Sequence, residues 1–332
     1  MTDFSSNVYH SENLTTLSEH LATRLDLLDS SDTVAIDRLE ALIADRLGIS
    51  PDGVLLTAGA TSAIHMLAAH FHGSASIIPQ PTSSEYAAAC RINNHVISYE
   101  NAESLSNLPN DRVYWICNPN NPSGNVLMKG FMDYVAKRSP RYKFIVDQTF
   151  ESYTSEPLQV PSEVQALPNL FLLHSISKTY GVPGLRLGYI TSAPSTIGQL
   201  RARRAPRSIS PLAAEAGMFL LSECHPAVTD IKAYLDEAAR LRKALRQTGH
   251  IRVYEGKTGY MLCELTDGDS SSLCNWLAAE RDILVRDCSE NFGLSGGFFR
   301  VTTQHPEEND LLVGAINDYY SLDVEARKES KK

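Results

Sequence analysis

The sequence lacks the cysteine pattern of small disulfide-bonded secreted proteins and of zinc sites. Its 332 residues contain only six cysteines, which form no C-x-x-C pair and have no cluster of histidines beside them. This pattern argues against a disulfide framework and against a zinc site. We therefore expect reduced, mostly buried cysteines in a cytoplasmic protein without a metal.

Long hydrophobic runs and an excess of positive charge are also lacking. No segment approaches the roughly 20 apolar residues needed to cross a bilayer, and the opening MTDFSSNVYHSEN lacks the basic start and apolar core of a signal peptide. The net charge is −9, whereas general nucleic-acid binders need surplus cations to displace counterions from phosphates. We expect neither nucleic acid nor a membrane as a partner.

Short apolar runs recur through the first two thirds of the chain, with helical patterns between most of them. Several of these runs do not alternate between apolar and polar residues, as expected for strands that helices cover on both faces. This order predicts an α/β fold with a mostly parallel sheet. The predicted strands are Val54–Thr57, Ala75–Ile78, Val113–Cys117, Phe144–Val146, Phe171–Leu173 and Tyr189–Thr191.

The pattern changes from about Pro211 onward. A long helical stretch leads into a predicted strand pair at Ile251–Leu265, and a last helix follows Pro306. This layout is typical of an α+β unit. We predict a large α/β domain over residues 29–215 and a small α+β domain built from residues 1–28 and 216–332.

Polar motifs follow several of the predicted strands, at the carboxyl ends where open parallel sheets bind ligands. Gly59-Ala60-Thr61-Ser62 follows the first strand and opens a helix. Its free N–H groups would suit a phosphate, although a plain N-capped helix is also consistent with this sequence. In the later segment NPNNPSG, Asn121 either presents its amide to a ring hydroxyl or belongs to a tight turn.

Two more strands deliver charged residues to the same edge. Asp147 stands directly behind an apolar strand, and a buried carboxylate needs a partner such as a protonated ring nitrogen or a helix N-terminus. Ser175, Ser177, Lys178 and Arg186 lie in SISKTYGVPGLRLGY after the next strand. Each of these signals is weak when taken singly.

Together and in this order, the motifs resemble those of the fold type I pyridoxal-phosphate enzymes of the class I and II aminotransferase family. The resemblance extends from about Asp29 to Tyr320, and the combination of NPNNPSG with S-x-S-K and an arginine eight residues after the lysine is highly specific. It implies the fold type I architecture, with a large domain around a mostly parallel mixed sheet and a smaller α+β domain. It also implies pyridoxal 5'-phosphate (PLP) as the cofactor, and a homodimer.

The resemblance assigns a role to each polar residue of the strand ends. Lys178 would form the Schiff base with the cofactor and act as general acid and base, which requires a neutral amine. Asp147 would keep the ring nitrogen protonated, and Asn121 would bond the ring hydroxyl. The cofactor phosphate would be held by the backbone of Ala60 and Thr61, the hydroxyls of Ser175 and Ser177, and the guanidinium of Arg186.

Two arginines are assigned to the substrate. Arg300 in FFRVT matches the residue that binds the α-carboxylate in the family, and an unpaired arginine inside an apolar strand would be costly. Arg286 in ILVRDCSENFGL resembles the branch of histidinol-phosphate aminotransferases and threonine-phosphate decarboxylases, in which the matching arginine helps to bind the substrate's phosphate. A surface salt bridge from Arg286 to Asp287 or Glu290 is the alternative.

The sequence departs from the family pattern at several positions. Ser83 stands where relatives carry an aromatic residue that stacks on the ring, and Tyr86 is one candidate to replace it. Phe150 replaces the usual tyrosine of the aminotransferases. The tyrosine that reaches the neighbouring subunit's phosphate in relatives is not evident near Ser30–Asp32.

The resemblance therefore predicts a PLP-dependent aminotransferase that acts on a small molecule, either an amino acid or a phosphorylated amino compound. A PLP-dependent decarboxylase of a phosphorylated amino acid is the main alternative, and the motif Val182-Pro-Gly-Leu-Arg favours it. A further alternative is a PLP-binding regulatory protein without catalytic activity.

Overall fold

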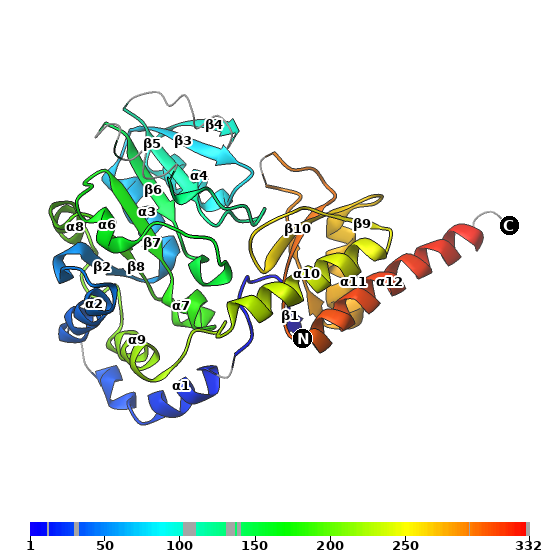
Figure 1. Cartoon of the computed structure of the whole chain (residues 1–332), viewed down its shortest axis with the longest axis horizontal. Coiled ribbons are helices and arrows are strands. Elements are labelled where there is room, and N and C mark those ends of the chain that lie inside the picture. Colours follow the sequence, from blue (N-terminus) through cyan, green and yellow to red (C-terminus); the bar gives the residue numbers. More distant parts are fainter. Residues whose placement is uncertain are drawn as a thin grey trace.

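A seven-stranded sheet forms the centre of the larger part of the molecule (Figure 1). The structure, a computed structural model, describes residues 1–11, 13–29, 33–101, 111–130, 137, 141–291 and 293–329. In the sheet order β2-β8-β7-β6-β5-β3-β4, only β8 is antiparallel to its neighbours. This confirms the predicted mostly parallel, mixed sheet. The strands are β2 (Val54–Thr57), β3 (Ala75–Gln80), β4 (Val96–Asn101), β5 (Val113–Cys117), β6 (Lys143–Asp147), β7 (Leu170–His174) and β8 (Gly188–Thr191).

Helices cover both faces of this sheet, which explains why its strands are apolar without alternation. On β5, Trp115 packs into the hydrophobic cluster of one face, whereas Tyr114 packs into that of the other. The first face is covered by α3 (Gly59–His70), α4 (Ser84–Ile92) and α8 (Pro194–Arg201). The second carries α1 (Asn13–Ala22), α2 (Val34–Leu47), α6 (Pro161–Val164), α7 (Ile176–Thr179) and α9 (Pro211–Glu223).

The smaller part of the molecule contains a four-stranded antiparallel sheet, in the order β12-β13-β10-β9. Its hydrophobic cluster includes Phe4, so the N-terminal segment belongs to this core. The part comprises β1 (Thr2–Asp3), which pairs with β11 (Ile283–Leu284), together with α10 (Ile231–Gln247), β9 (Ile251–Val253), β10 (Tyr260–Leu265), α11 (Ser270–Arg281), β12 (Arg286–Asp287), β13 (Phe298–Thr302) and α12 (Pro306–Glu329). Four short 3-10 helices are described elsewhere in the chain, namely η1 (Leu25–Asp29), η2 (Pro51–Gly53), η4 (Glu151–Tyr153) and η5 (Pro183–Leu185).

The packing of the first residues bears on the predicted domain boundaries. Phe4 packs with the smaller sheet, but Leu17 of α1 packs in the cluster formed by α2 and α9. Residues 1–28 are therefore divided between the two cores. The boundaries 29–215, 1–28 and 216–332 stay a prediction.

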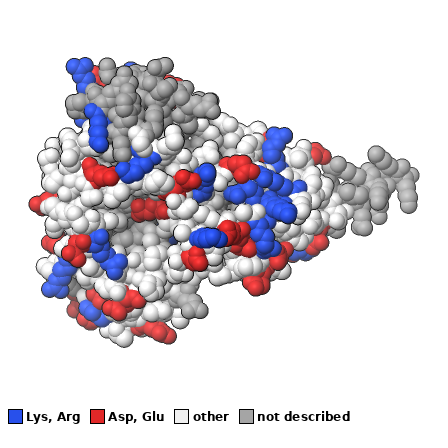
Figure 2. All heavy atoms as spheres, viewed as in Figure 1, with Lys and Arg blue, Asp and Glu red and all other residues white. Residues whose placement is uncertain are grey.

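On the face that Figure 2 shows, charged side chains are spread widely, and Lys and Arg gather mainly where α10 and β9 lie in Figure 1. Part of this charge is paired, because Arg240 bonds Glu237 and Asp310, and Arg246 bonds Glu255. None of the described helices is both long and apolar enough to cross a membrane. Within the described ranges, no three His, Cys, Asp or Glu side chains are grouped so that they could hold a metal ion. The cytoplasmic location stays a prediction.

Candidate cofactor and substrate site

The cofactor-binding residues predicted from the sequence lie at the same side of the large sheet, at or beyond the ends of its strands. β5, β6 and β7 are parallel neighbours, so the segments that follow them leave the sheet on the same side. The start of β8 joins them there, because β8 is antiparallel and pairs Gly188 with Thr57 at the end of β2. The loop before β8 thereby approaches the N-terminus of α3.

Lys178 lies in α7 with its amine inside the site. Its Nζ donates to the backbone oxygen of Ser6 and lies 5.8 Å from the centre of the Phe150 ring. Burial, together with the positive charges of Arg300 and Arg186, lowers the pKa of this amine to about 8, while Asp3 acts in the opposite direction. A lowered pKa makes a neutral, nucleophilic amine available near neutral pH.

Asp147 is a buried carboxylate at the end of β6, with 5% of its surface exposed. Its Oδ2 accepts a hydrogen bond of 2.7 Å from the hydroxyl of Tyr86, and its Oδ1 accepts one of 3.0 Å from the backbone N–H of Thr149. Burial raises the pKa of Asp147, and these hydrogen bonds work against that rise. Each oxygen of an ionised carboxylate has a second lone pair, so a protonated ring nitrogen fits as a further donor.

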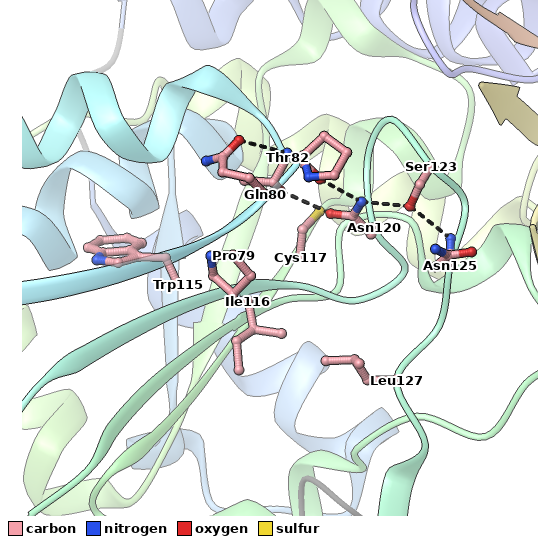
Figure 3. A pocket seen from close by; sticks show the side chains of 11 residues that line it. Pro79, Gln80, Thr82, Trp115, Ile116, Cys117, Asn120, Ser123, Asn125 and Leu127 are labelled. Atoms are coloured by element: carbon pink, nitrogen blue, oxygen red, sulfur yellow. Dashed lines mark hydrogen bonds between the residues drawn. The ribbon is translucent and has the colours of Figure 1, made fainter. Parts of the chain in front are cut away.

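The NPNNPSG loop is held in shape by its own side chains, as Figure 3 shows around a cavity of about 90 Å³. Asn120 donates to the hydroxyl of Ser123 (2.7 Å) and to the backbone oxygen of Pro81 (3.0 Å). The hydroxyl of Thr82 donates in turn to Asn120 (3.0 Å). These bonds join the loops that follow β3 and β5, and they fix the backbone that carries Asn121.

Asn121 connects this loop to the smaller sheet. Its side-chain oxygen accepts a hydrogen bond from Nη1 of Arg300. The amide nitrogen is therefore the end of the side chain that can donate to a ring hydroxyl. The assigned role of Asn121 fits this orientation and stays a prediction.

The N-terminus of α3 and the guanidinium of Arg186 form a cradle that suits a phosphate. The N-cap residue Ala58 makes no side-chain capping bond, which leaves the first N–H groups of α3, including those of Ala60 and Thr61, without a cap. Gly59 has φ +81°, and a Cβ there would lie 3.0 Å from Nη2 of Arg186. A Cβ at position 59 would therefore be in tight contact with the guanidinium, which would have to shift by a few tenths of an ångström.

The two serines of S-x-S-K have structural partners. The hydroxyl of Ser175 accepts from the backbone N–H of Lys178 (3.2 Å) and caps α7. The hydroxyl of Ser177 accepts from the N–H of Leu187 (2.8 Å) and donates to its carbonyl oxygen (3.2 Å). Ser177 thereby ties α7 to the residue after Arg186. The phosphate roles of Ser175 and Ser177 stay predictions.

Arg300 is buried in β13, with 6% of its surface exposed. Its Nη1 and Nη2 donate to Asn121 and to the backbone oxygen of Ser5, whereas its buried Nε has no hydrogen-bond partner among the described residues. Burial lowers the pKa of the guanidinium to about 10. A buried guanidinium with an unused donor suits the carboxylate of a substrate.

Arg286 lies directly opposite Arg300 in the β12–β13 pair and is exposed. The alternative of a surface salt bridge is not found in the described part of the chain, where Arg286 has no ion pair with Asp287 or Glu290. The Asp287 carboxylate instead accepts hydrogen bonds from the serines of α11 and from the N–H of Ser289. Residues 30–32, where the sequence showed no matching tyrosine, lie outside the described residues.

Two contributions to the site were missed by sequence reasoning. The backbone oxygens of Ser5 and Ser6 accept hydrogen bonds from Arg300 and Lys178, respectively. Any residue type can make such a backbone contact, so the sequence gives no sign of it. Tyr86 does not stand in for the missing aromatic at position 83, because its ring is fully buried and stacks on Trp115 with centroids 6.0 Å apart. Its hydroxyl bonds Asp147 instead.

Comparison with known proteins extends these observations. The family described as "Aminotransferase class I and II" matches residues 1–316. A threonine-phosphate decarboxylase of Salmonella typhimurium is 26% identical over 332 residues, which cover 95% of this chain and 90% of the relative. A histidinol-phosphate aminotransferase of Parabacteroides distasonis is 28% identical over 300 residues and 85% of each chain. The crystal structure of L-threonine-O-3-phosphate decarboxylase from Porphyromonas gingivalis superimposes with a TM-score of 0.91 at 28% identity, covering 97% of this chain and 100% of the other.

The close contact between Gly59 and Arg186 can be tested by substitution. Gly59→Ala should weaken PLP binding by about 10-fold or more, because the new Cβ displaces the Arg186 guanidinium and one charge-assisted hydrogen bond contributes about 1.5–3 kcal/mol. The measurement is a fluorescence titration of cofactor-free protein with PLP.

Gly48→Ala is the control, because Gly48 also has a positive φ (+64°) but nothing lies within 4 Å of its added Cβ. It should carry similar backbone strain and leave the Kd for PLP unchanged. Equal effects of both substitutions on the Kd would contradict the assignment of the cradle.

Proposed function

The chain belongs to the aminotransferase class I and II family, and from this premise we propose that it is a PLP-dependent decarboxylase of a phosphorylated amino acid. The protein is an enzyme of this family, and its cofactor is pyridoxal 5'-phosphate. The decarboxylation and the phosphorylated substrate are the proposal. The alternative of a regulatory protein without activity is set aside, because the relatives are enzymes.

The pairing of Arg286 with Arg300 carries the proposal. Directly opposite residues of an antiparallel pair project from the same face of the sheet, and like charges there repel each other. The positive charge of Arg286 also lowers the pKa of Arg300, after the larger effect of burial. Two anionic groups separated by a few bonds would compensate both guanidinium groups at once. A carboxylate together with a phosphate, as in O-phosphothreonine, is such a ligand.

The chain's residues can be assigned to the steps of this reaction. When bound, PLP withdraws electrons from the substrate's Cα. Asp147 would keep a proton on the ring nitrogen through its negative charge, and Arg300 would bind the carboxylate until it leaves. In decarboxylation the bond between Cα and the carboxylate carbon breaks, CO2 departs, and Cα takes up a proton. We assign the delivery of this proton to Lys178, whose pKa of about 8 lets the amine carry or release it near neutral pH.

Transamination of a phosphorylated amine is the second candidate, and it was the first prediction from the sequence. A histidinol-phosphate aminotransferase that is 28% identical supports it. In this reaction Lys178 would remove the proton from Cα and deliver it to the cofactor carbon that carries the nitrogen, because the amino group leaves the substrate with the cofactor. Arg286 would then bind the phosphate, and Arg300 would bind the carboxylate of the acceptor acid.

One experiment separates the two reactions. We expect the enzyme with PLP to release CO2 from O-phospho-L-threonine without a keto acid, and Lys178→Ala to abolish this release. Histidinol phosphate with 2-oxoglutarate is assayed in parallel for amino transfer. Amino transfer to 2-oxoglutarate without CO2 release from O-phosphothreonine would contradict decarboxylation and favour the second candidate.

The phosphate role of Arg286 can be tested with the same assay. Arg286→Gln should lower kcat/KM for the phosphorylated substrate by roughly 10- to 100-fold, since a hydrogen bond between charged groups contributes about 1.5–3 kcal/mol. Its activity on the unphosphorylated amino acid should not change. Arg252→Gln removes a charge from β9 of the same sheet and should affect neither substrate. Equal losses of Arg286→Gln on both substrates would refute the role.

We also propose that the protein is a homodimer. Large apolar side chains are exposed on consecutive segments at the N-terminal end, namely Leu14, Leu25, Leu28 and Val34. The helices that carry them, α1, η1 and α2, all contact α9, and burial of this surface against a second copy would be favourable.

Sedimentation should show a dimer that Leu28→Glu dissociates, while Leu311→Glu on α12 does not. A monomeric native protein would refute the proposal.

A further inference from the structure

Tyr86 lies deep in the large sheet's core and still reaches the site. Its side chain is 1% exposed, and its ring stacks on Trp115 with an interplanar angle of 29°. The hydroxyl donates to Oδ2 of Asp147 over 2.7 Å. The packing of α4 against the sheet therefore fixes both the phenol and the direction of its hydrogen bond.

Other titratable groups lie near Asp147, and the thiol of Cys117 also contacts the Tyr86 hydroxyl. Cys117 is the neighbour of Asp147 on β5, and burial raises the pKa of that thiol to about 12, so the thiol stays neutral. His174 at the end of β7 bonds Glu151 and the hydroxyl of Thr191.

Tyr260 on β10 also faces this region, and its hydroxyl donates to the backbone oxygen of Asn120 (3.0 Å). Among the described residues outside the loop that follows Asp147, Tyr86 is therefore the one whose side chain donates to the Asp147 carboxylate.

A donor in this position favours the charged form of the carboxylate. Burial in the core disfavours ionised Asp147, whereas a hydrogen bond from a neutral hydroxyl stabilises the ion more than the acid. Tyr86 remains a donor, because burial and the nearby Asp147 charge raise the pKa of its phenol. Without it, the backbone N–H and the side chain of Thr149 would be left as the hydrogen-bond donors to the charge among the described residues.

We propose that Tyr86 is a positioning residue that keeps Asp147 ionised and directed at the cofactor's ring nitrogen. This inference rests on the proposed function only through the use of PLP. The phenol does not touch the reacting atoms. It acts through the charge and orientation of the carboxylate, so that a proton resides on the ring nitrogen and not on Asp147.

The first test uses cofactor-free protein. Tyr86→Phe, Asp147→Asn and the double variant form a cycle in which urea unfolding is measured at two or more pH values. Tyr86→Phe should raise the unfolding equilibrium constant by about 10-fold at pH values where Asp147 is ionised. In the Asp147→Asn background this effect should largely disappear.

The sign of the pH dependence follows from the raised pKa of Asp147. The folded state binds its proton more tightly than the unfolded state, so stability falls as the pH rises from the unfolded pKa through the folded pKa. Tyr86→Phe should raise the folded pKa further and extend this fall to higher pH. A destabilisation that is independent of pH and unchanged by Asp147→Asn would overturn the proposal, because a purely structural role predicts that result.

A matched control removes the same kind of bond elsewhere. The hydroxyl of Tyr254 donates to the Glu264 carboxylate over 2.7 Å in the smaller sheet. Tyr254→Phe should leave PLP binding unchanged at every pH, because neither residue faces the Asp147 carboxylate.

The second test follows PLP binding against pH. Tyr86→Phe should weaken PLP binding roughly 10- to 100-fold at neutral pH. The acidic limb, which is the pH range in which affinity falls as the pH is lowered, should shift to higher pH by about one unit or more. Asp147→Asn should bind weakly without that limb. An unchanged limb in Tyr86→Phe would overturn the proposal. If the native protein bound no PLP, the proposed function and the assigned ring contact would both fail, and the cycle on cofactor-free protein would still decide whether Tyr86 controls the charge of Asp147.

Discussion

The burial of a carboxylate at the end of β6 is the constraint on which the site depends. A buried charge is costly unless hydrogen bonds and opposite charges compensate it. Asp147 receives donors from α4 and from its own loop, and its remaining lone pairs suit the protonated ring of PLP. The parallel direction of β5, β6 and β7 brings this charge to the edge where Lys178 follows the next strand.

The proposed site includes Arg300 of the smaller sheet, so both parts of the chain would contribute to it. Arg300 on β13 bonds Asn121 in the loop that follows β5 and the backbone of Ser5 in the N-terminal segment. Its charge also helps to lower the pKa of Lys178, after burial. The guanidinium that suits a substrate carboxylate therefore also favours the neutral form of the amine, which links substrate binding to the acid–base chemistry of Lys178.

Much of this arrangement could be predicted from the sequence, because the central strands are buried on both faces and read as apolar runs. The edge strand β4 was missed because its first residues alternate between exposed and half-buried positions, so that it does not form a continuous apolar run. Val96, for example, is 68% exposed. The residues of β8 do not show that this strand runs antiparallel to its neighbours, so its direction could not be predicted. Residues directly behind strands could be placed at the site, whereas Tyr86 and Ser6 meet their partners across 61 and 172 positions of the chain. Such contacts depend on how helix and sheet pack, which local patterns do not encode.

The same residues can support decarboxylation and transamination, which explains how relatives of both kinds resemble this chain at 26–28% identity. Both reactions need a protonated ring nitrogen and a proton moved at Cα, so Asp147 and Lys178 do not discriminate between them. The discrimination must come from groups that orient the substrate around Cα. Arg300 and Arg286 are the candidates, because two cations on one face of the sheet restrict how a molecule with two anionic groups can lie. Under the proposed roles, the choice of reaction would depend on the smaller sheet, whereas the large sheet would supply the chemistry common to both.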